Sequence, residues 1–316
     1  MDPTVTVIIV NYFTADKATR AVDSIYAHCQ TPFEIILVDN SCDAAEFGRL
    51  VAALGDRVVL IDNGRNAGFG AACNAGAARA RGKYLLFFNP DARVLDDSIS
   101  LLVQEMEVTP ELGALGGKLV DDDGLENHSA GRFVSLRTPL GDAKSLVVNS
   151  LRRALRRPSD GVATGGPATG AAAPRRQYVD YVVGADLLMR REDFARLGGF
   201  DEAFFMYVEE NELQYRLRQE LRLQAAIDHR ARFFHELGGA PGATTHWRRS
   251  RVLDGRCRFV HKHHGLPYQL LFQTLTLQLL VGQLFLGRVI GRFTLREDLA
   301  LLGIVAKWIK RAGASS

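Results

Sequence analysis

Short apolar runs alternate with helix-like segments along the first third of this 316-residue chain. The runs predict strands, and the segments between them carry apolar residues at the three- and four-residue spacing of helices. The predicted strands are Val5–Val10, Glu34–Val38, Val58–Ile61 and Tyr84–Phe88, and the predicted helices are Asp16–His28, Ala44–Leu54, Ala67–Ala80 and Asp97–Glu107. Strands that are apolar throughout are buried on both faces. The pattern therefore predicts an α/β fold with a mixed, mainly parallel sheet and helices on both faces.

Polar residues follow each of the four predicted strands. They are Asn11, Asp39-Asn40, Asp62-Asn63 and Asn89-Pro90-Asp91. A single Asn or Asp after a strand is an ordinary turn residue. Because ligands of such sheets bind beyond the carboxyl ends of the strands, four polar ends in a row favour a binding site at that edge.

The segment Gly199–Leu213 combines carboxylates with aromatic residues. The carboxylates are Asp201, Glu202, Glu209, Glu210 and Glu212, and they lie among Phe200, Phe204, Phe205, Met206 and Tyr207. Unpaired buried carboxylates are costly, so this mixture suggests a cleft that holds a partly desolvated carboxylate for chemistry. The alternative is a helix N-terminus, whose positive dipole end favours Glu209, Glu210 and Glu212.

The later part of the chain departs from this order. A basic, low-complexity insertion spans about 138–177 and is expected to be mobile. It contains the amphipathic run Ser145–Arg157. Helices are predicted over Tyr268–Ile290 and Asp298–Arg311. We expect a catalytic domain over 1–235 and a basic helical region over 236–316.

Charge is distributed unevenly along the chain, although the net charge is only +3. From His229 to the end there are 14 Lys and Arg against 4 Asp and Glu, a net charge of +10. A basic C-terminal region predicts an anionic partner, and no nucleic-acid motif accompanies it. Helices with an apolar face and basic residues predict association with an anionic membrane surface, or packing on protein, including a second copy of the chain.

Other features narrow the compartment and the class of protein. The chain begins without a basic signal-peptide region, and its four cysteines show no metal-ligand spacing. Free thiols indicate a reducing cytosol. The run Asn66-Ala67-Gly68-Phe69-Gly70 matches only part of a dinucleotide fingerprint, although a helix N-terminus there can receive phosphate oxygens.

Four ordered motifs then become specific: VTVIIVNY, FEIILVDNS, NAGFGAACNAGAARARGKYLLFFNPDARV and VGADLLMRREDFARLGGFDEAFFMYVEENEL. Together they cover roughly residues 4–235, and the set resembles the family-2 inverting glycosyltransferases of GT-A fold, with most similarity to the bacterial rhamnosyltransferase-like branch.

The resemblance implies roles for residues at the predicted strand ends. Asn11 and Asp39 would hold the donor nucleoside, with Asn66 and Gly68 near the nucleotide. Asn89-Pro90-Asp91 stands where the family has its DxD motif. Asn89 would therefore contact the donor and Asp91 would bind a divalent metal, Mg²⁺ or Mn²⁺. Asn in place of the first acid removes one negative charge from the metal site.

The resemblance also implies the catalytic residues. Glu209-Glu210-Asn211-Glu212-Leu213 stands where relatives have Glu-Asp-x-Asp-Leu, so Glu210 would be the general base. Glu209 and Glu212 would position the acceptor or the helix, and His235 would contact the metal or a phosphate.

The activity implied is inverting transfer of a sugar, such as rhamnose from dTDP-rhamnose, to a surface glycan or a polyprenol-linked acceptor. This would place the chain in cell-envelope polysaccharide biosynthesis, peripheral on the inner face of the cytoplasmic membrane. Two alternatives stay open from the residues alone: a non-catalytic nucleotide- or glycan-binding scaffold with the same fold, and a dinucleotide-dependent oxidoreductase.

Overall fold

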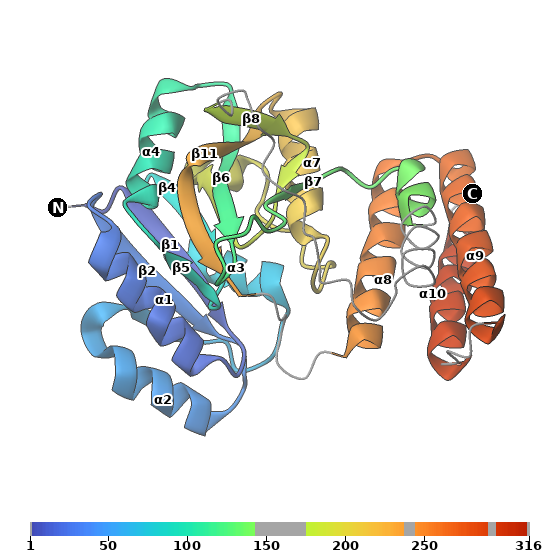
Figure 1. Ribbon diagram of the computed structural model, residues 1–316, viewed down its shortest axis with the longest axis horizontal. Coiled ribbons are helices and arrows are strands. Elements are labelled where there is room, and N and C mark those ends of the chain that lie inside the picture. Colours follow the sequence, from blue (N-terminus) through green and yellow to red (C-terminus); the bar gives the residue numbers. More distant parts are fainter. Residues whose placement is uncertain (1, 143–174, 237–243, 290–294, 315–316) are drawn as a thin grey trace, which may run out of the picture. The chain divides into compact units, whose positions relative to one another are not determined.

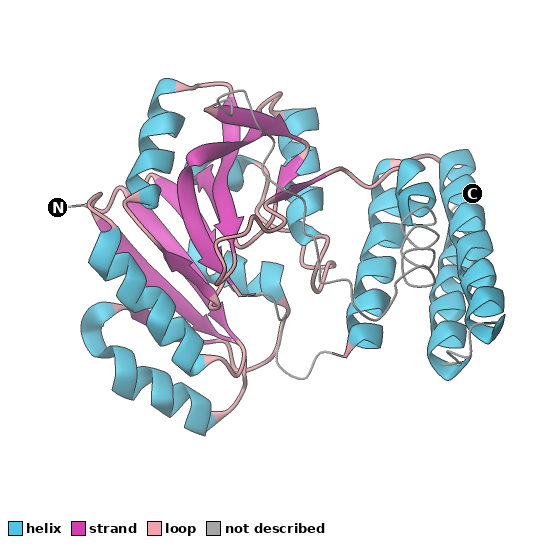
Figure 2. Ribbon diagram, in the orientation of Figure 1, coloured by secondary structure: helices cyan, strands magenta, loops and turns pink. Residues whose placement is uncertain are grey.

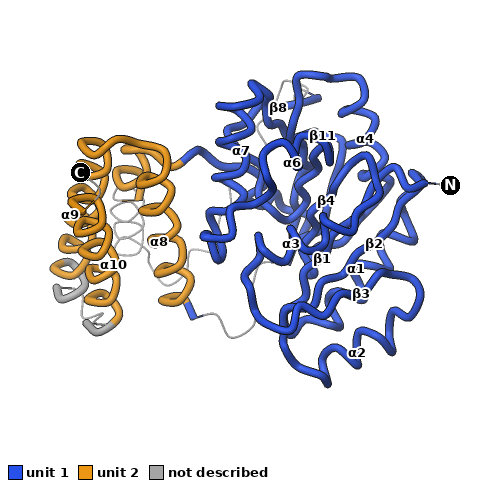
Figure 3. The backbone as a smooth tube through the Cα atoms, turned by 180° about the vertical axis from the view of Figure 1, so that it is seen from behind, with its two compact units in different colours: residues 1–133, 174–244 blue, residues 134–173, 245–316 orange. Residues whose placement is uncertain are grey.

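The computed structural model describes residues 2–142, 175–236, 244–289 and 295–314 (Figure 1). The chain forms two compact units (Figure 3): residues 1–133 with 174–244, and residues 134–173 with 245–316. The predicted division at residue 235 stays a prediction, and the amphipathic run Ser145–Arg157 lies outside the described residues.

The first unit is built from alternating strands and helices. Its elements are β1 (Val5–Asn11), α1 (Ala15–His28), β2 (Phe33–Asp39), α2 (Ala44–Leu54), β3 (Val59–Asp62), α3 (Phe69–Ala77), β4 (Tyr84–Phe88), β5 (Ala92–Val94), α4 (Ser98–Val108), β6 (Leu112–Val120), β7 (Ala130–Gly131), β8 (Arg176–Val179), β9 (Tyr181–Val182), β10 (Asp186–Arg190), α6 (Arg191–Arg196), α7 (Glu209–Glu220) and β11 (Gln224–His235).

The main sheet is mixed and mainly parallel, as predicted. Its strand order is β3-β2-β1-β4-β10-β6-β11-β5, and β8 pairs with β11. β1, β2, β3 and β4 run parallel, whereas β10 is antiparallel to both of its neighbours. The register pairs Asn11 with Asp39 and Asp39 with Asp62, so these strand ends meet at one edge of the sheet.

Helices cover both faces of the sheet (Figure 2). Alternate residues of β1 point to opposite faces: Val7 and Ile9 pack in one apolar cluster, and Ile8 and Val10 in the other. The first cluster includes residues of α1, α2 and α4, and the second includes residues of α3, α6 and α7. This two-sided burial is the reason why the central strands are apolar throughout.

The second unit contains α8 (Thr245–His263), α9 (Leu266–Val289) and α10 (Leu295–Ala314). The last two correspond to the predicted helices Tyr268–Ile290 and Asp298–Arg311, and α8 is an additional helix. Trp308 is buried and donates its indole N–H to the Asp254 carboxylate at 2.8 Å. None of the described helices is long and apolar enough to cross a membrane.

Candidate active site

The ends of β1 and β2 are joined by a buried polar network. Asn11 Nδ2 donates to Asp39 Oδ1 at 2.8 Å, and both residues are fully buried. The Ser41 hydroxyl lies within hydrogen-bond distance of both Asp39 carboxylate oxygens, at 2.8 and 2.7 Å. The two residues predicted to hold the nucleoside therefore hold each other, and they shape the edge at which the strands end.

Asn40 connects this edge to the loop before α3, a role that the sequence analysis missed. Its Nδ2 donates to the Gly68 carbonyl at 3.0 Å and to Asn66 Oδ1 at 3.3 Å. Its Oδ1 accepts from Asn63 Nδ2 at 2.7 Å. The exposed Asn66 is thereby held beside the end of β2, where it was predicted to lie near the nucleotide.

The loop of residues 66–68, here called the donor loop after its predicted role, lies against Gly199–Leu213, here called the acidic segment. Gly68 makes this contact possible. Its φ of +89° is in the left-handed region, and a Cβ there would lie 2.3 Å from the Phe205 carbonyl oxygen. The next residue, Phe69, donates its backbone N–H to that same oxygen at 3.0 Å. Only glycine permits both the conformation and the contact. This contact explains why α3 begins at Phe69 rather than at the predicted Ala67.

The acidic segment enters α7 through a strained residue. Tyr207 has a φ of +83°, which is unfavourable for a bulky side chain, and Glu209 and Glu210 begin the helix two and three residues later. Glu209 is buried and accepts the Val208 N–H at 2.8 Å. Burial, reinforced by the neighbouring Glu210, raises the pKa of the Glu209 carboxyl well above its usual range.

Glu210 is partly exposed, and burial raises its pKa to about 7. Within the described residues its Oε2 has no hydrogen-bond partner. Gly184 faces it, because a Cβ at Gly184 would lie 4.0 Å from the Glu210 Cβ and 3.3 Å from the Phe69 ring. A carboxylate with a pKa near neutrality suits a general base.

Glu212 has a different environment from Glu210. It is fully buried, and Arg216 donates to both of its oxygens at 2.8–3.0 Å. Arg216 also donates to the carbonyls of Leu197 and Gly199, at 2.5 and 2.8 Å. The pair anchors α7 to the start of the acidic segment, which is a positioning contact.

Asn89, Asp91 and His235 meet just beyond the end of β4. His235 Nε2 lies 3.4 Å from Asp91 Oδ1 and 3.3 Å from Asn89 Nδ2. β11 brings His235 there by pairing it with Ala92. The described residues contain no group of three or more His, Cys, Asp and Glu for a metal. Carboxylate oxygen and imidazole nitrogen still fit an Mg²⁺ or Mn²⁺ ion that takes its remaining ligands from phosphates and water.

The family model described as Glycosyl transferase family 2 matches residues 6–179, more than half of the chain. This chain belongs to glycosyl transferase family 2. Membership of this family argues against the oxidoreductase alternative.

Two relatives are similar to this chain over about two thirds of its length. The chain is 31% identical over 221 residues to the O-antigen biosynthesis protein RfbC of Myxococcus xanthus, covering 69% of this chain but 16% of that protein. It is 27% identical over 229 residues to the N-acetylglucosaminyl-diphospho-decaprenol L-rhamnosyltransferase of Mycobacterium tuberculosis, covering 67% of this chain and 69% of that protein. The chain thus spans a small part of the first relative and about two thirds of the second.

Two solved structures have the same fold as this family 2 chain. The mannosyltransferase PcManGT from Pyrobaculum calidifontis, in complex with GDP-Man and Mn²⁺, matches with a TM-score of 0.53 and 15% identity over 99% of this chain and 87% of that chain. GalNAc-T7 with UDP, GalNAc and Mn²⁺ matches with a TM-score of 0.55 and 18% identity over 82% of this chain and 48% of that chain. The likeness establishes a GT-A-like fold, as the sequence predicted.

Asp186 is another buried acidic residue, and the sequence analysis did not single it out. It is fully buried at the start of β10, accepts the Gly117 N–H at 2.6 Å, and leaves Oδ1 without a partner among the described residues. Burial raises its pKa to about 7. Its only signal in the sequence is a charge at the head of the apolar run LLM.

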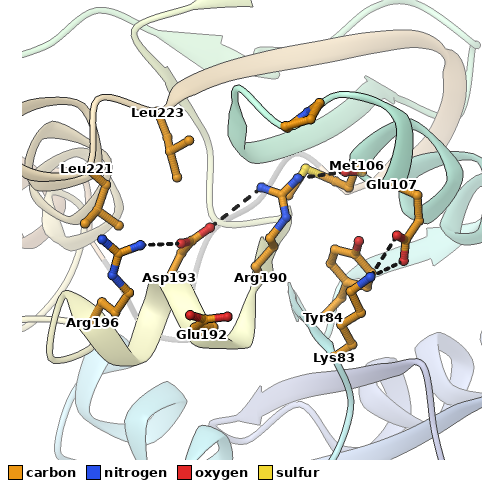
Figure 4. A pocket seen from close by; sticks show the side chains of 11 residues that line it. Lys83, Tyr84, Met106, Glu107, Arg190, Glu192, Asp193, Arg196, Leu221 and Leu223 are labelled. Atoms are coloured by element: carbon orange, nitrogen blue, oxygen red, sulfur yellow. Dashed lines mark hydrogen bonds and ion pairs between the residues drawn. The ribbon is translucent and has the colours of Figure 1, made fainter.

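A pocket of about 450 Å³ lies at the opposite end of β4 from Asn89, beside Lys83 and Tyr84 (Figure 4). Five of its charged side chains pair with one another: Lys83 with Glu107 at 2.6 Å, and Arg190 and Arg196 with Asp193 at 3.6 and 3.5 Å. The residues that resemble the family's motifs lie at the other edge of the sheet, so we place the candidate active site there.

The raised pKa of Glu210 predicts a pH-dependent cost to stability. Between about pH 4.5 and 7 the folded protein keeps a proton that the unfolded chain has released. Stability is therefore lost as pH rises through this window. Glu210→Gln removes this cost. We expect its gain in the free energy of unfolding to be larger at pH 8 than at pH 5 by about 1–2 kcal/mol, a range reduced for partial solvent exposure.

Urea unfolding at the two pH values measures this difference. Glu202→Gln removes the charge of an exposed carboxylate in the same segment and is the control. Equal effects of Glu210→Gln at both pH values, or a loss of stability at pH 8, would contradict a raised pKa.

Proposed function

We propose that this family 2 enzyme is an inverting glycosyltransferase in which Glu210 is the general base. The observation that carries the proposal is the position of Glu210. Glu210 lies beside Gly184 and three residues after the strained Tyr207. Burial raises the pKa of its carboxyl group to about 7. The donor loop is tied to the same segment through the Phe69 N–H and the Phe205 carbonyl.

Inversion proceeds by a single displacement. The acceptor hydroxyl attacks the anomeric carbon, the bond from that carbon to the diphosphate oxygen breaks, and Glu210 takes the hydroxyl proton. Glu209 is buried against the backbone of Val208, and Glu212 is paired with Arg216. These two acids therefore support the geometry of α7, and Glu210 is left to act on the acceptor.

We propose that the departing nucleoside diphosphate lies beyond the end of β4. Asp91 and His235 would hold a divalent ion, with Asn89 beside them. When bound, the ion supplies neutralisation of the charge that develops on the leaving diphosphate. Asn66 and Gly68 would contact the nucleotide, and the buried Asn11–Asp39 pair would set the floor on which the nucleoside rests.

A deoxyhexose donor such as dTDP-rhamnose and a polyprenol-linked acceptor are our specific proposals. The Mycobacterium tuberculosis relative is named an L-rhamnosyltransferase acting on N-acetylglucosaminyl-diphospho-decaprenol, and it is similar over 67% of this chain. The Myxococcus xanthus relative is named for O-antigen biosynthesis. Both names support a role in assembling envelope polysaccharide on a lipid-linked precursor.

Membrane association of the second unit is also proposed. Its helices expose Leu270, Leu271, Phe285 and Leu299, with Phe285 65% exposed. Lys307, Lys310 and Arg311 are exposed on α10. Exposed apolar side chains on helices that also carry basic residues favour an anionic lipid surface, where a lipid-linked acceptor lies.

The role of Glu210 predicts a distinct kinetic signature. Glu210→Gln keeps the shape of the side chain but cannot take the proton, so kcat should fall by roughly 10²–10⁴ while donor affinity changes only a few-fold. Glu209→Gln and Glu212→Gln are the matched controls in the same helical turn and should reduce kcat less. Release of nucleoside diphosphate from a panel of UDP-, dTDP- and GDP-sugars, with Mn²⁺ or Mg²⁺, gives the rates. Normal turnover by Glu210→Gln would show that another residue is the base.

Vesicle flotation tests the membrane proposal. The full chain should float with vesicles containing an anionic phospholipid at low ionic strength and be released at about 0.5 M salt, because the attraction is partly electrostatic. Lys307→Glu combined with Lys310→Glu should weaken binding. Arg57→Glu combined with Arg79→Glu, on the first unit, has the same change of charge and should not. A full-length chain that never floats would contradict the proposal.

A further inference from the structure

The Asn74 side chain, on α3, forms two hydrogen bonds with the backbone of Phe200. It donates one and accepts the other, as a neighbouring β-strand would. Its Oδ1 accepts the Phe200 N–H at 2.9 Å, and its Nδ2 donates to the Phe200 carbonyl at 2.9 Å. Nδ2 also lies 3.1 Å from the Glu202 carboxylate. Among the side chains close in size to Asn, only the carboxamide offers both a donor and an acceptor in this geometry.

The backbone at this contact is adapted to the close approach. Gly199 has a φ of +75°, and a Cβ there would lie 2.6 Å from Asn74 Oδ1. Phe200 is buried and packs against Phe69 and Phe87, with ring centroids 6.2 and 5.0 Å apart. The start of the acidic segment is therefore held on α3 by both hydrogen bonds and packing.

The end of the acidic segment is held on the same helix. Phe69, the first residue of α3, donates its N–H to the Phe205 carbonyl. The segment between Phe200 and Phe205 is thus bound to α3 at both ends, and the strained Tyr207 and Glu210 follow directly. Since Glu210 Oε2 has no hydrogen-bond partner among the described residues, its place depends on the backbone that leads to it.

We infer that Asn74 is a positioning residue, which holds the acidic segment on α3 so that Glu210 faces the acceptor. The inference rests on the proposed role of Glu210. Asn74 lies too far along α3 to be part of the donor loop, and α3 itself is held by close packing of Gly76 against Ile8 and Val38. Losing the Asn74 contacts loosens the acidic segment and leaves the donor loop in place.

The test compares Asn74→Ala and the nearly isosteric Asn74→Asp with two controls. Asn74→Asp keeps the acceptor for the Phe200 N–H but places a carboxylate oxygen against the Phe200 carbonyl and the Glu202 carboxylate. Glu202→Ala removes only the third contact. Ser100→Ala removes two comparable bonds, from the Thr31 N–H and the Thr31 hydroxyl to the Ser100 hydroxyl at 3.0 and 2.8 Å, where a helix holds a loop near the other end of the sheet.

We expect kcat for sugar-nucleotide hydrolysis to fall by roughly tenfold to a hundredfold in Asn74→Ala, and at least as far in Asn74→Asp, because a small displacement of a reacting group has this effect. The donor KM should change by no more than about threefold, since the donor loop stays in place. The midpoint of the pH–rate profile should fall from near 7 toward the ordinary carboxylate value as water reaches Glu210.

Amide hydrogen exchange supplies a readout that does not depend on activity. Exchange at Phe200 and across residues 201–208 should be faster in Asn74→Ala and unchanged in Ser100→Ala. A normal pH profile and normal exchange in both Asn74 variants, or a loss of kcat matched by Ser100→Ala, would overturn the inference. Normal turnover by Glu210→Gln would instead overturn the proposed function, so the two failures are distinguishable.

Discussion

The hydrogen bond from the Phe69 N–H to the Phe205 carbonyl joins the two segments on which the site depends. On one side of this bond lies the donor loop, which Asn40 ties to the end of β2. On the other side lies the acidic segment that leads into α7. Because Gly68 allows the backbones to touch, one short helix places both the donor loop and Glu210, the proposed general base. The sheet in turn places α3, through the close contact of Gly76 with Ile8.

The first turn of α7 combines two carboxyl groups whose ionisation is disfavoured by burial with one carboxylate that is paired with an arginine. Burial raises the pKa of both Glu209 and Glu210, so their ionisation costs stability at neutral pH. Glu212 accepts hydrogen bonds from Arg216 on both of its carboxylate oxygens. Three acids within four residues therefore differ in role because their partners differ. Such a combination of strain and unfavourable burial is typical of a functional site.

The sheet was predictable because its central strands are buried on both faces and so read as continuous apolar runs. The polar residues after these runs do lie together, since parallel strands bring their carboxyl ends to one edge of the sheet. The connecting role of Asn40 and the contacts of Asn74 were missed because their partners are 26 and 126 residues away in the sequence, and no local pattern encodes such contacts. Asp186 was missed because a charge inside an apolar motif has no periodic signature. The start of α3 was misplaced by two residues because the conformation of Gly68 is fixed by Phe205.

The central claim is that donor, metal and base meet at one edge of the sheet. A crystal structure of the full chain with Mn²⁺ and a nucleoside diphosphate, with anomalous scattering to locate the metal, tests it most directly. The account predicts Mn²⁺ in contact with both the Asp91 carboxylate and the His235 imidazole, and the diphosphate between that ion and the donor loop at Asn66 and Gly68. A metal and nucleotide bound elsewhere, with Asp91 and His235 free of both, would contradict it.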